Sequence, residues 1–387
     1  MSLISYGKQY LDSKDIKSVN KILNSNFLTQ GPTIKKFENR LKFQLGAKFC
    51  TAVSNGTAAL HLLGLALKWK KGDVIISTPN SFVATSNCIV YSGASPVFVD
   101  IDYKTGNICT KSLEKKIQLL KKQKKKIKAI IAIDYGGCPA DWPKLQKISK
   151  KNKIILINDG CHSLGASIQK NFKYAAKYAD FVTYSFHPVK SITTGEGGAI
   201  VSNNKQVDQL LKNLRTHGIE KNNNILWMYD MKKLGFNYRI TDFQCALGIS
   251  QLSKLKKFIN RRIEIAKIYN KAFLNDKRIA NQFIGPNKSS SYHLYVIKID
   301  FKKLKLNKND FFKKLLKFGI KLQVHYIPIY KHSFYRKRFN FKEKNFPNTE
   351  KFYNEVVSLP IFYNLSKKKQ LYVISKIKKI ILKNKII

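Results

Sequence analysis

Short apolar runs alternate with amphipathic stretches over the first two-thirds of the chain. The amphipathic stretches, for example residues 57–67 and 142–150, carry their apolar positions at helical spacing. Between them lie apolar runs of strand length, at 73–77, 96–100, 127–134, 154–159, 181–186 and 198–202. Buried strands separated by helices predict an α/β fold with a mostly parallel central sheet flanked by helices. Ligands bind beyond the carboxyl ends of such strands, and polar residues of this chain fall there.

The last third has a different pattern. Residues 242–271 predict one long helix, because apolar residues recur there at helical spacing. Beyond it, residues 292–299 and 319–326 predict strands of a smaller α+β domain. We therefore expect a large domain over 1–255 and a small C-terminal domain over 256–387.

The charge balance is extreme, with 72 Lys and Arg against 23 Asp and Glu, a formal net charge of +49 over 387 residues. Such a charge suggests a basic nucleic-acid-binding protein as one alternative. However, the excess is mostly lysine spread along the whole length, and Ile and Asn are also abundant, which indicates a biased codon pool. No nucleic-acid-binding signature accompanies it. We expect a solvated basic surface that attracts small anions and no specific nucleic acid.

Several other protein classes are disfavoured. No apolar run reaches the roughly 18 residues of a membrane span, and the N-terminus lacks the pattern of a secretory signal. The cysteines are scattered without a CxxC pair, so we expect neither a metal site nor a disulfide framework. A reducing cytoplasm fits them best. The six cysteines are Cys50, Cys88, Cys109, Cys138, Cys161 and Cys245.

Lys190 is the main catalytic candidate. The apolar run 181–186 leads into Pro188, then Lys190, then a glycine-rich turn. A lysine in a tight, partly apolar pocket loses hydration, and its pKa falls toward that of a nucleophilic amine. This is the chemistry of a Schiff-base lysine. For any single lysine of so basic a chain, a solvated loop position is the alternative.

A second feature lies where an apolar strand ends at Val53 and the Gly56-Thr57 step opens a helix. Free backbone N–H groups, a hydroxyl and the positive helix end would converge there on an anion. The spacing is not that of a Walker loop. A plain helix cap by Ser54, Asn55 or Thr57 is the alternative.

Asp159 lies at the end of a predicted buried strand, where a carboxylate is costly unless it is paired. A pyridinium nitrogen is a suitable partner, because a charge-assisted hydrogen bond keeps the ring of pyridoxal phosphate protonated. A structural helix cap is the alternative. His162, three residues on, could contact the phenolic oxygen or ring face of that cofactor, although a lone histidine is more often structural.

Three further residues complete the candidate site. Ser185 could donate to a phosphate group, and Phe82, on a loop after a strand, could stack on a flat heteroaromatic ring. On its own, however, Phe82 would be assigned to the core. For His187, substrate contact and simple packing are equally consistent with the sequence.

Taken together in this order, the motifs resemble the DegT/DnrJ/EryC1/StrS family of sugar aminotransferases, and the resemblance covers essentially the whole chain. It rests on the segments already described and on others, namely YGKQY (6–10), FLTQGP (27–32), LRTHG (214–218), LGFNYRITDFQ (234–244) and VHYIP (324–328). One departure is Asn158-Asp159-Gly160-Cys161, where the family often has Glu-Asp followed by small residues. Asp159 itself is kept.

The resemblance implies a pyridoxal-phosphate-dependent transferase of fold type I. It implies that Lys190 binds the cofactor covalently, that Asp159 pairs the ring nitrogen, and that Asn237 reaches the phosphate from a neighbouring subunit. The enzyme would then be a homodimer with shared active sites. In the same way it assigns the phosphate to Gly56, Thr57 and Ser185, ring stacking to Phe82, and a place beside the ring to His162.

The segments SFHPVKSITTGEGG and HYIPIY are most similar to family members that aminate a UDP-linked 4-keto-6-deoxy-N-acetylhexosamine at C4 with L-glutamate as donor. Another nucleotide-sugar 3- or 4-aminotransferase, acting for example on a dTDP- or GDP-sugar, is the alternative. A sister branch that deoxygenates sugars has His in place of Lys190, so Lys190 favours amino transfer. Residues that we expect to contact substrate are His187, His217, His325 and Tyr326.

Overall fold

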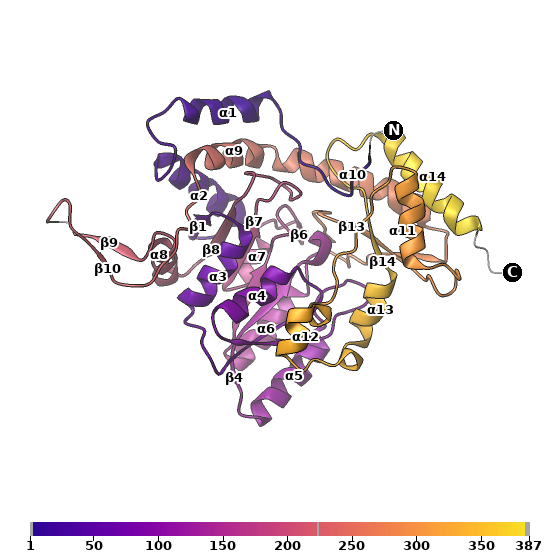
Figure 1. The fold of residues 1–387 in the computed structure, drawn as a ribbon, viewed down its shortest axis with the longest axis horizontal. Helices are drawn as coiled ribbons and strands as arrows, with labels where there is room; N and C mark the ends of the chain where they lie inside the picture. The colour runs from indigo at the N-terminus through magenta and orange to yellow at the C-terminus, as the bar shows by residue number, and fades with distance from the viewer. Residues whose placement is uncertain (1–2, 223, 384–387) are drawn as a thin grey trace.

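The computed structural model describes residues 3–222 and 224–383. At its centre lies a seven-stranded sheet of order β1-β8-β7-β5-β4-β2-β3 (Figure 1). Neighbouring strands from β7 to β3 are parallel, and only β8 runs antiparallel to its neighbours. The expected mostly parallel sheet is therefore confirmed. Its strands are β1 (Phe49–Val53), β2 (Asp73–Ser77), β3 (Ser95–Phe98), β4 (Lys126–Ile133), β5 (Ile155–Asp159), β7 (Phe181–Ser185) and β8 (Gly198–Ser202).

Both faces of this sheet are buried, which explains why its strands are apolar at successive positions. Along β4, Ile130 and Ala132 belong to one core cluster, whereas Ala129 and Ile131 belong to another. Because side chains alternate between the two faces of a strand, each cluster fills one face. The helices covering the sheet are α2 (Pro32–Leu45), α3 (Gly56–Ala66), α4 (Val83–Tyr91), α5 (Thr110–Lys122), α6 (Trp142–Asn152), α7 (Tyr174–Tyr178), α8 (Lys205–Leu214) and α9 (Asp242–Ser253), with α1 (Ser13–Leu23) packed on α9.

A smaller unit lies at the right of Figure 1, where an antiparallel sheet β11-β13-β14 has its own core. The predicted strand at 292–299 is present as β13, although it begins only at Tyr295. Ile4 also packs in this core, and helix α10 passes from the first core, at Ile259, to this one, at Ile265. The domain division at residue 255 stays a prediction. The elements are α10 (Leu255–Phe273), β11 (Ile279–Asn281), β13 (Tyr295–Ile299), α11 (Lys308–Lys317), β14 (Val356–Leu359) and α14 (Lys367–Lys383).

Two sequence predictions are wrong. The single helix over 242–271 is two helices, α9 and α10, which meet at the turn residue Lys254. The Lys254 ammonium pairs with Asp12 and Asp15 at the start of α1. The strand over 319–326 is absent. This segment makes only isolated bridges, at Ile320 and Gln323, and then leaves the sheet edge toward a large cavity.

Two remaining segments extend from these units. The hairpin of β9 (Ile219–Lys221) and β10 (Tyr229–Met231) projects from the left side of the molecule (Figure 1), with Leu226 94% and Trp227 84% exposed. The segment carrying α12 (Ser333–Arg338) and α13 (Pro347–Glu355) packs back on the large unit, where Tyr335 meets Phe98. Strands β6 (Ser167–Ile168) and β12 (Lys288–Ser289) form a short pair. Within the described ranges, no helix combines the length and apolarity needed to cross a membrane.

Candidate active site

A cavity of about 880 Å³ opens at the carboxyl ends of the central strands. One wall carries the ends of β5 and β7 together with the first turns of α3 and α4, and the other carries residues 323–327 from the small unit. Its volume lies within the range of small-molecule sites. Of the twelve predicted site residues, ten line this cavity: Gly56, Thr57, Phe82, Asp159, His162, Ser185, His187, Lys190, His325 and Tyr326.

The start of α3 supplies an anion site on the large-unit wall. Asn55 caps the helix by accepting from the Ala58 N–H at 2.8 Å. The N–H groups of Gly56 and Thr57 belong to the first turn, where no intrahelical acceptor exists, and both residues line the cavity. A Cβ on Gly56 would lie 2.8 Å from the Ser185 Cβ, so only glycine fits there. Backbone donors, the hydroxyls of Thr57 and Ser185 and a helix N-terminus thus share this part of the cavity, which suits a phosphate group.

Asp159 ends β5 and is 7% exposed. Its Oδ2 accepts a hydrogen bond from the Thr85 hydroxyl at 2.6 Å, and its Oδ1 accepts from the Cys161 N–H at 3.3 Å. The two bonds fix the orientation of the carboxylate, while each oxygen can still accept from a ring nitrogen. Thr85, in α4, was not singled out from the sequence.

Lys190 lies in the turn after β7, where its N–H donates to the carbonyl of His187 at 2.9 Å. Burial lowers the pKa of its ammonium group, while Cys161 and Asp159 act in the opposite direction. The lowered pKa increases the share of uncharged amine, the nucleophilic form, over that of a solvated lysine.

Phe82 is 56% exposed and lines the cavity, so it is not a core residue. Its ring centroid lies 6.0 Å from that of Tyr326 on the opposite wall. An exposed aromatic face at this position suits stacking on a flat ring. With the anion site, the oriented carboxylate and the lysine, this arrangement fits pyridoxal phosphate.

Three buried histidines line the same cavity as Lys190: His162, His293 and His325. Burial is the main cause that lowers the pKa of each imidazole. Lys190 comes next for His162 and His325, whereas His162 comes before Lys190 for His293. All three are therefore neutral imidazoles at neutral pH. His293 packs its ring 4.3 Å from that of His162.

Two predicted residues lie elsewhere. His217 and Asn237 are exposed and do not line the cavity of their own chain. They lie side by side near the hairpin, where the His217 N–H donates to Phe236 and Thr216 bridges to Asn237. The role expected for Asn237, a contact made from a second copy of the chain, stays a prediction.

The structure adds cavity residues that the sequence did not indicate, among them Tyr6, Thr85, Cys161, Glu196 and His293. His293 had no sequence signal, because it lies before the amino end of β13 rather than at the carboxyl end of a strand. Thr85 had no sequence signal either, since a threonine in the first turn of a helix is common and does not by itself indicate a functional site.

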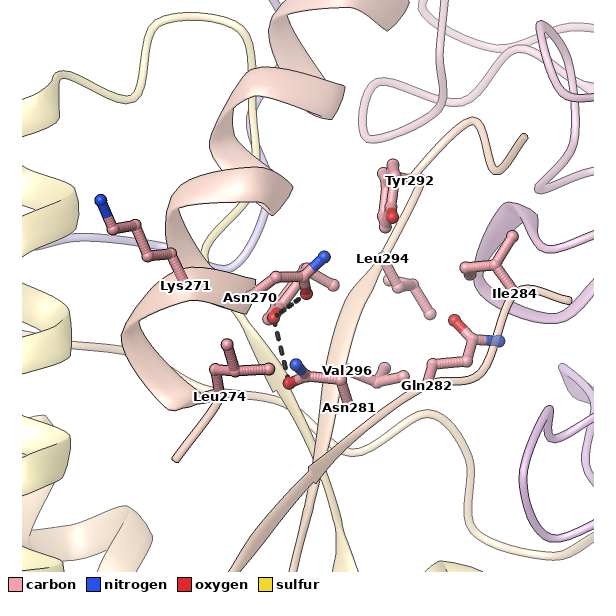
Figure 2. Close-up of a pocket in the computed structure, with 10 residues that line it drawn as sticks. Asn270, Lys271, Leu274, Asn281, Gln282, Ile284, Tyr292, Leu294 and Val296 are labelled. Atoms are coloured by element: carbon pink, nitrogen blue, oxygen red, sulfur yellow. Dashed lines mark hydrogen bonds between the residues drawn. The ribbon is translucent and has the colours of Figure 1, made fainter. Parts of the chain in front are cut away.

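A separate cavity of about 370 Å³ lies in the small unit between α10 and β13 (Figure 2). There the Tyr295 hydroxyl contacts the side-chain oxygens of Asn270 and Asn281 at 2.7 and 3.1 Å. None of the predicted site residues lines it. No group of three or more metal-ligating side chains occurs in the part of the chain that the structure describes.

Comparison with known proteins identifies the class. A model of the DegT/DnrJ/EryC1/StrS aminotransferase family matches residues 9–378, so the chain belongs to this family. It is 39% identical over 366 residues to the UDP-4-amino-4,6-dideoxy-N-acetyl-beta-L-altrosamine transaminase of Campylobacter jejuni, covering 95% of this chain and 94% of that protein.

Two solved structures agree with this assignment. Helicobacter pylori PseC, an aminotransferase involved in the biosynthesis of pseudoaminic acid, superimposes with a TM-score of 0.90 at 34% identity, over 99% of both chains. The sugar aminotransferase Spr1654 of Streptococcus pneumoniae, in its pyridoxal phosphate form, gives 0.91 at 27% identity, over 99% of this chain and 100% of that one. The protein is a sugar aminotransferase of fold type I, and the expected enzyme class is confirmed.

Proposed function

We propose that this enzyme moves the amino group of L-glutamate to the C4 ketone of a UDP-linked 4-keto-6-deoxy-N-acetylhexosamine. The products are UDP-4-amino-4,6-dideoxy-N-acetyl-β-L-altrosamine and 2-oxoglutarate. The similarity to the Campylobacter jejuni transaminase and to PseC supports this substrate, and it supports a place in pseudaminic acid biosynthesis. The observation that carries amino transfer is a partly buried Lys190 of lowered pKa in a cavity that also holds an oriented Asp159.

In this proposal the cofactor is pyridoxal 5′-phosphate, which supplies an electron sink for the carbanion formed at the substrate Cα. Gly56, Thr57 and Ser185 hold its phosphate, and Asp159 holds its ring nitrogen. Phe82 lies against the ring. Lys190 binds the cofactor and, once displaced by substrate, moves the Cα proton as general base and then as acid.

The functional test is a panel of UDP- and dTDP-4-keto sugars with L-glutamate, with the product identified by NMR and 2-oxoglutarate release measured in parallel. Amination at C4 of the UDP-linked N-acetylhexosamine is expected. Reaction with a dTDP-sugar alone would favour the alternative family specificity. The Lys190→Ala variant is the control for chemistry at the proposed site.

The proposal includes a homodimer with shared active sites. Large apolar side chains on the projecting hairpin, such as Leu226 and Trp227, are what a second copy would cover. Asn237, at the base of this hairpin, would then reach the phosphate of the partner's cofactor.

Mixed subunits test this sharing. A Lys190→Ala chain and an Asn237→Ala chain are each expected to be inactive alone. When they are co-expressed, one site of each mixed dimer regains an intact Lys190 and the partner's Asn237. Restored activity is expected, and its absence in verified mixed dimers would contradict a shared site.

A further inference from the structure

Tyr326 enters the cavity from the wall opposite the proposed cofactor contacts. Every residue proposed to hold the cofactor within the chain lies between Gly56 and Lys190, on the large-unit wall. Tyr326 belongs to the segment that leaves the small-unit sheet edge after Gln323. A substrate bound between a cofactor on the large-unit wall and the opposite wall would therefore lie next to Tyr326.

One hydrogen bond connects the two walls at this point. The Nε2 atom of His162 lies 2.8 Å from the Tyr326 hydroxyl oxygen. The other ring nitrogen, Nδ1, lies 3.3 Å from the backbone nitrogen of Gly136, whose N–H is directed at it. An amide N–H can only donate, so Nδ1 must carry the lone pair.

These contacts fix the positions of two protons. A neutral imidazole with its lone pair on Nδ1 carries its proton on Nε2, and therefore donates to the Tyr326 oxygen. In this hydrogen bond the Tyr326 oxygen is the acceptor, so the Tyr326 O–H does not donate to His162. Within residues 3–222 and 224–383 this hydroxyl has no other hydrogen-bond partner. Its O–H is thus available to the cavity.

The surroundings keep His162 in this form. Burial, then Lys190 and His325, hold its pKa well below the usual value, so the imidazolium form is disfavoured. Burial also raises the pKa of Tyr326, which keeps its hydroxyl protonated. The backbone at His162 is also held, since the Ser291 hydroxyl donates to the His162 carbonyl at 2.6 Å.

We propose that Tyr326 donates a hydrogen bond to the carbonyl oxygen of the keto-sugar substrate, and that His162 is the positioning residue that directs this proton into the cavity. The inference rests on the proposed function and assigns a role in its second half, where the ketone reacts. A single neutral O–H donor suits a ketone oxygen better than a carboxylate, which calls for a cation. Donation polarises the carbonyl, so that its carbon accepts nitrogen more readily.

The test separates the two half-reactions by single-turnover kinetics. Tyr326→Phe removes the hydroxyl and keeps the ring. We expect the reaction with L-glutamate to stay within about threefold of wild type, and the reaction with the keto sugar to slow by about a hundredfold, as for loss of one carbonyl-oxygen donor. Tyr335→Phe removes a hydroxyl outside this cavity, where it donates to Asn87, and is the matched control, expected to leave both rates unchanged.

His162 has its own variants. His162→Leu should reproduce the selective loss, whereas His162→Gln, which keeps an N–H able to reach Tyr326, should restore much of the keto-sugar rate. Equal losses in both half-reactions, or no loss with the keto sugar, would overturn the inference. If the wild type released 2-oxoglutarate but aminated no keto sugar, the proposed function would fail instead.

A second measurement needs neither substrate nor cofactor. NMR of isotope-labelled histidine nitrogens in the cofactor-free protein should show His162 with its proton on Nε2 at neutral pH. His162→Gln identifies the signal by its loss. A proton on Nδ1, or a charged imidazolium, would overturn the inference whatever the sugar.

Discussion

Removal of the Thr85 hydroxyl should loosen the carboxylate proposed to hold the cofactor ring. The Thr85 Oγ1 to Asp159 Oδ2 distance is 2.6 Å, and the two residues are 1% and 7% exposed. Hydrogen bonds to charged groups contribute about 1.5–3 kcal/mol, and about 1.4 kcal/mol is a tenfold change in an equilibrium constant. Thr85→Val keeps the branched shape within α4 and should weaken cofactor binding by about 10- to 100-fold.

The assay is titration of cofactor-free protein with pyridoxal phosphate, followed by visible absorbance. Thr85→Ser retains the hydroxyl and is the control, expected to bind close to wild type. Chemical denaturation of both cofactor-free variants reports the folding cost separately. If Thr85→Val and Thr85→Ser bind the cofactor equally well, the orienting role of this hydroxyl is refuted.

Three further outcomes are expected. Lys190→Ala should abolish turnover and the visible absorbance of the loaded protein, and a variant that kept both would contradict the assignment of Lys190. Gly56→Ala should lose cofactor binding, because its Cβ would lie 2.8 Å from the Ser185 Cβ, whereas Gly7→Ala, with a nearest contact of 3.6 Å, should bind normally; equal binding would contradict the close fit. Burial, then Lys190, lowers the pKa of His325 to about 3, so the folded state binds fewer protons than the unfolded state below about pH 6.5. The free energy of unfolding should thus fall with acidification by up to about 1.4 kcal/mol per pH unit from this group, and urea denaturation should show a shallower dependence for His325→Asn than for wild type.

The central sheet could be predicted because its strands are buried on both faces, so each is a continuous apolar run in the sequence. The residues at the strand ends, Asp159 and Ser185, could be predicted for the same reason, since the fold brings such ends to one edge. By contrast, the sequence does not predict strand β14. Its four residues directly follow helix α13, so no turn signal separates the strand from the helix.

The contacts that orient the site could not be read from local pattern. The hydrogen bond between Thr85 and Asp159 joins residues 74 positions apart in sequence, and the one between Tyr326 and His162 joins residues 164 positions apart. Likewise Lys254, at the turn between α9 and α10, pairs with Asp12 and Asp15, far away in sequence. Such pairings depend on how elements pack, and no periodicity within one element encodes them.

Helix α10 has a consequence for how the protein loses its structure. One end of this helix packs in the core of the large unit and the other in that of the small unit, and between them the buried Arg262 donates to the carbonyls of Tyr292, His293 and Ile361. Unfolding of either core would therefore displace Arg262 and break its hydrogen bond to the His293 carbonyl. Calorimetry should accordingly record one cooperative transition, and catalysis should disappear with it rather than before it.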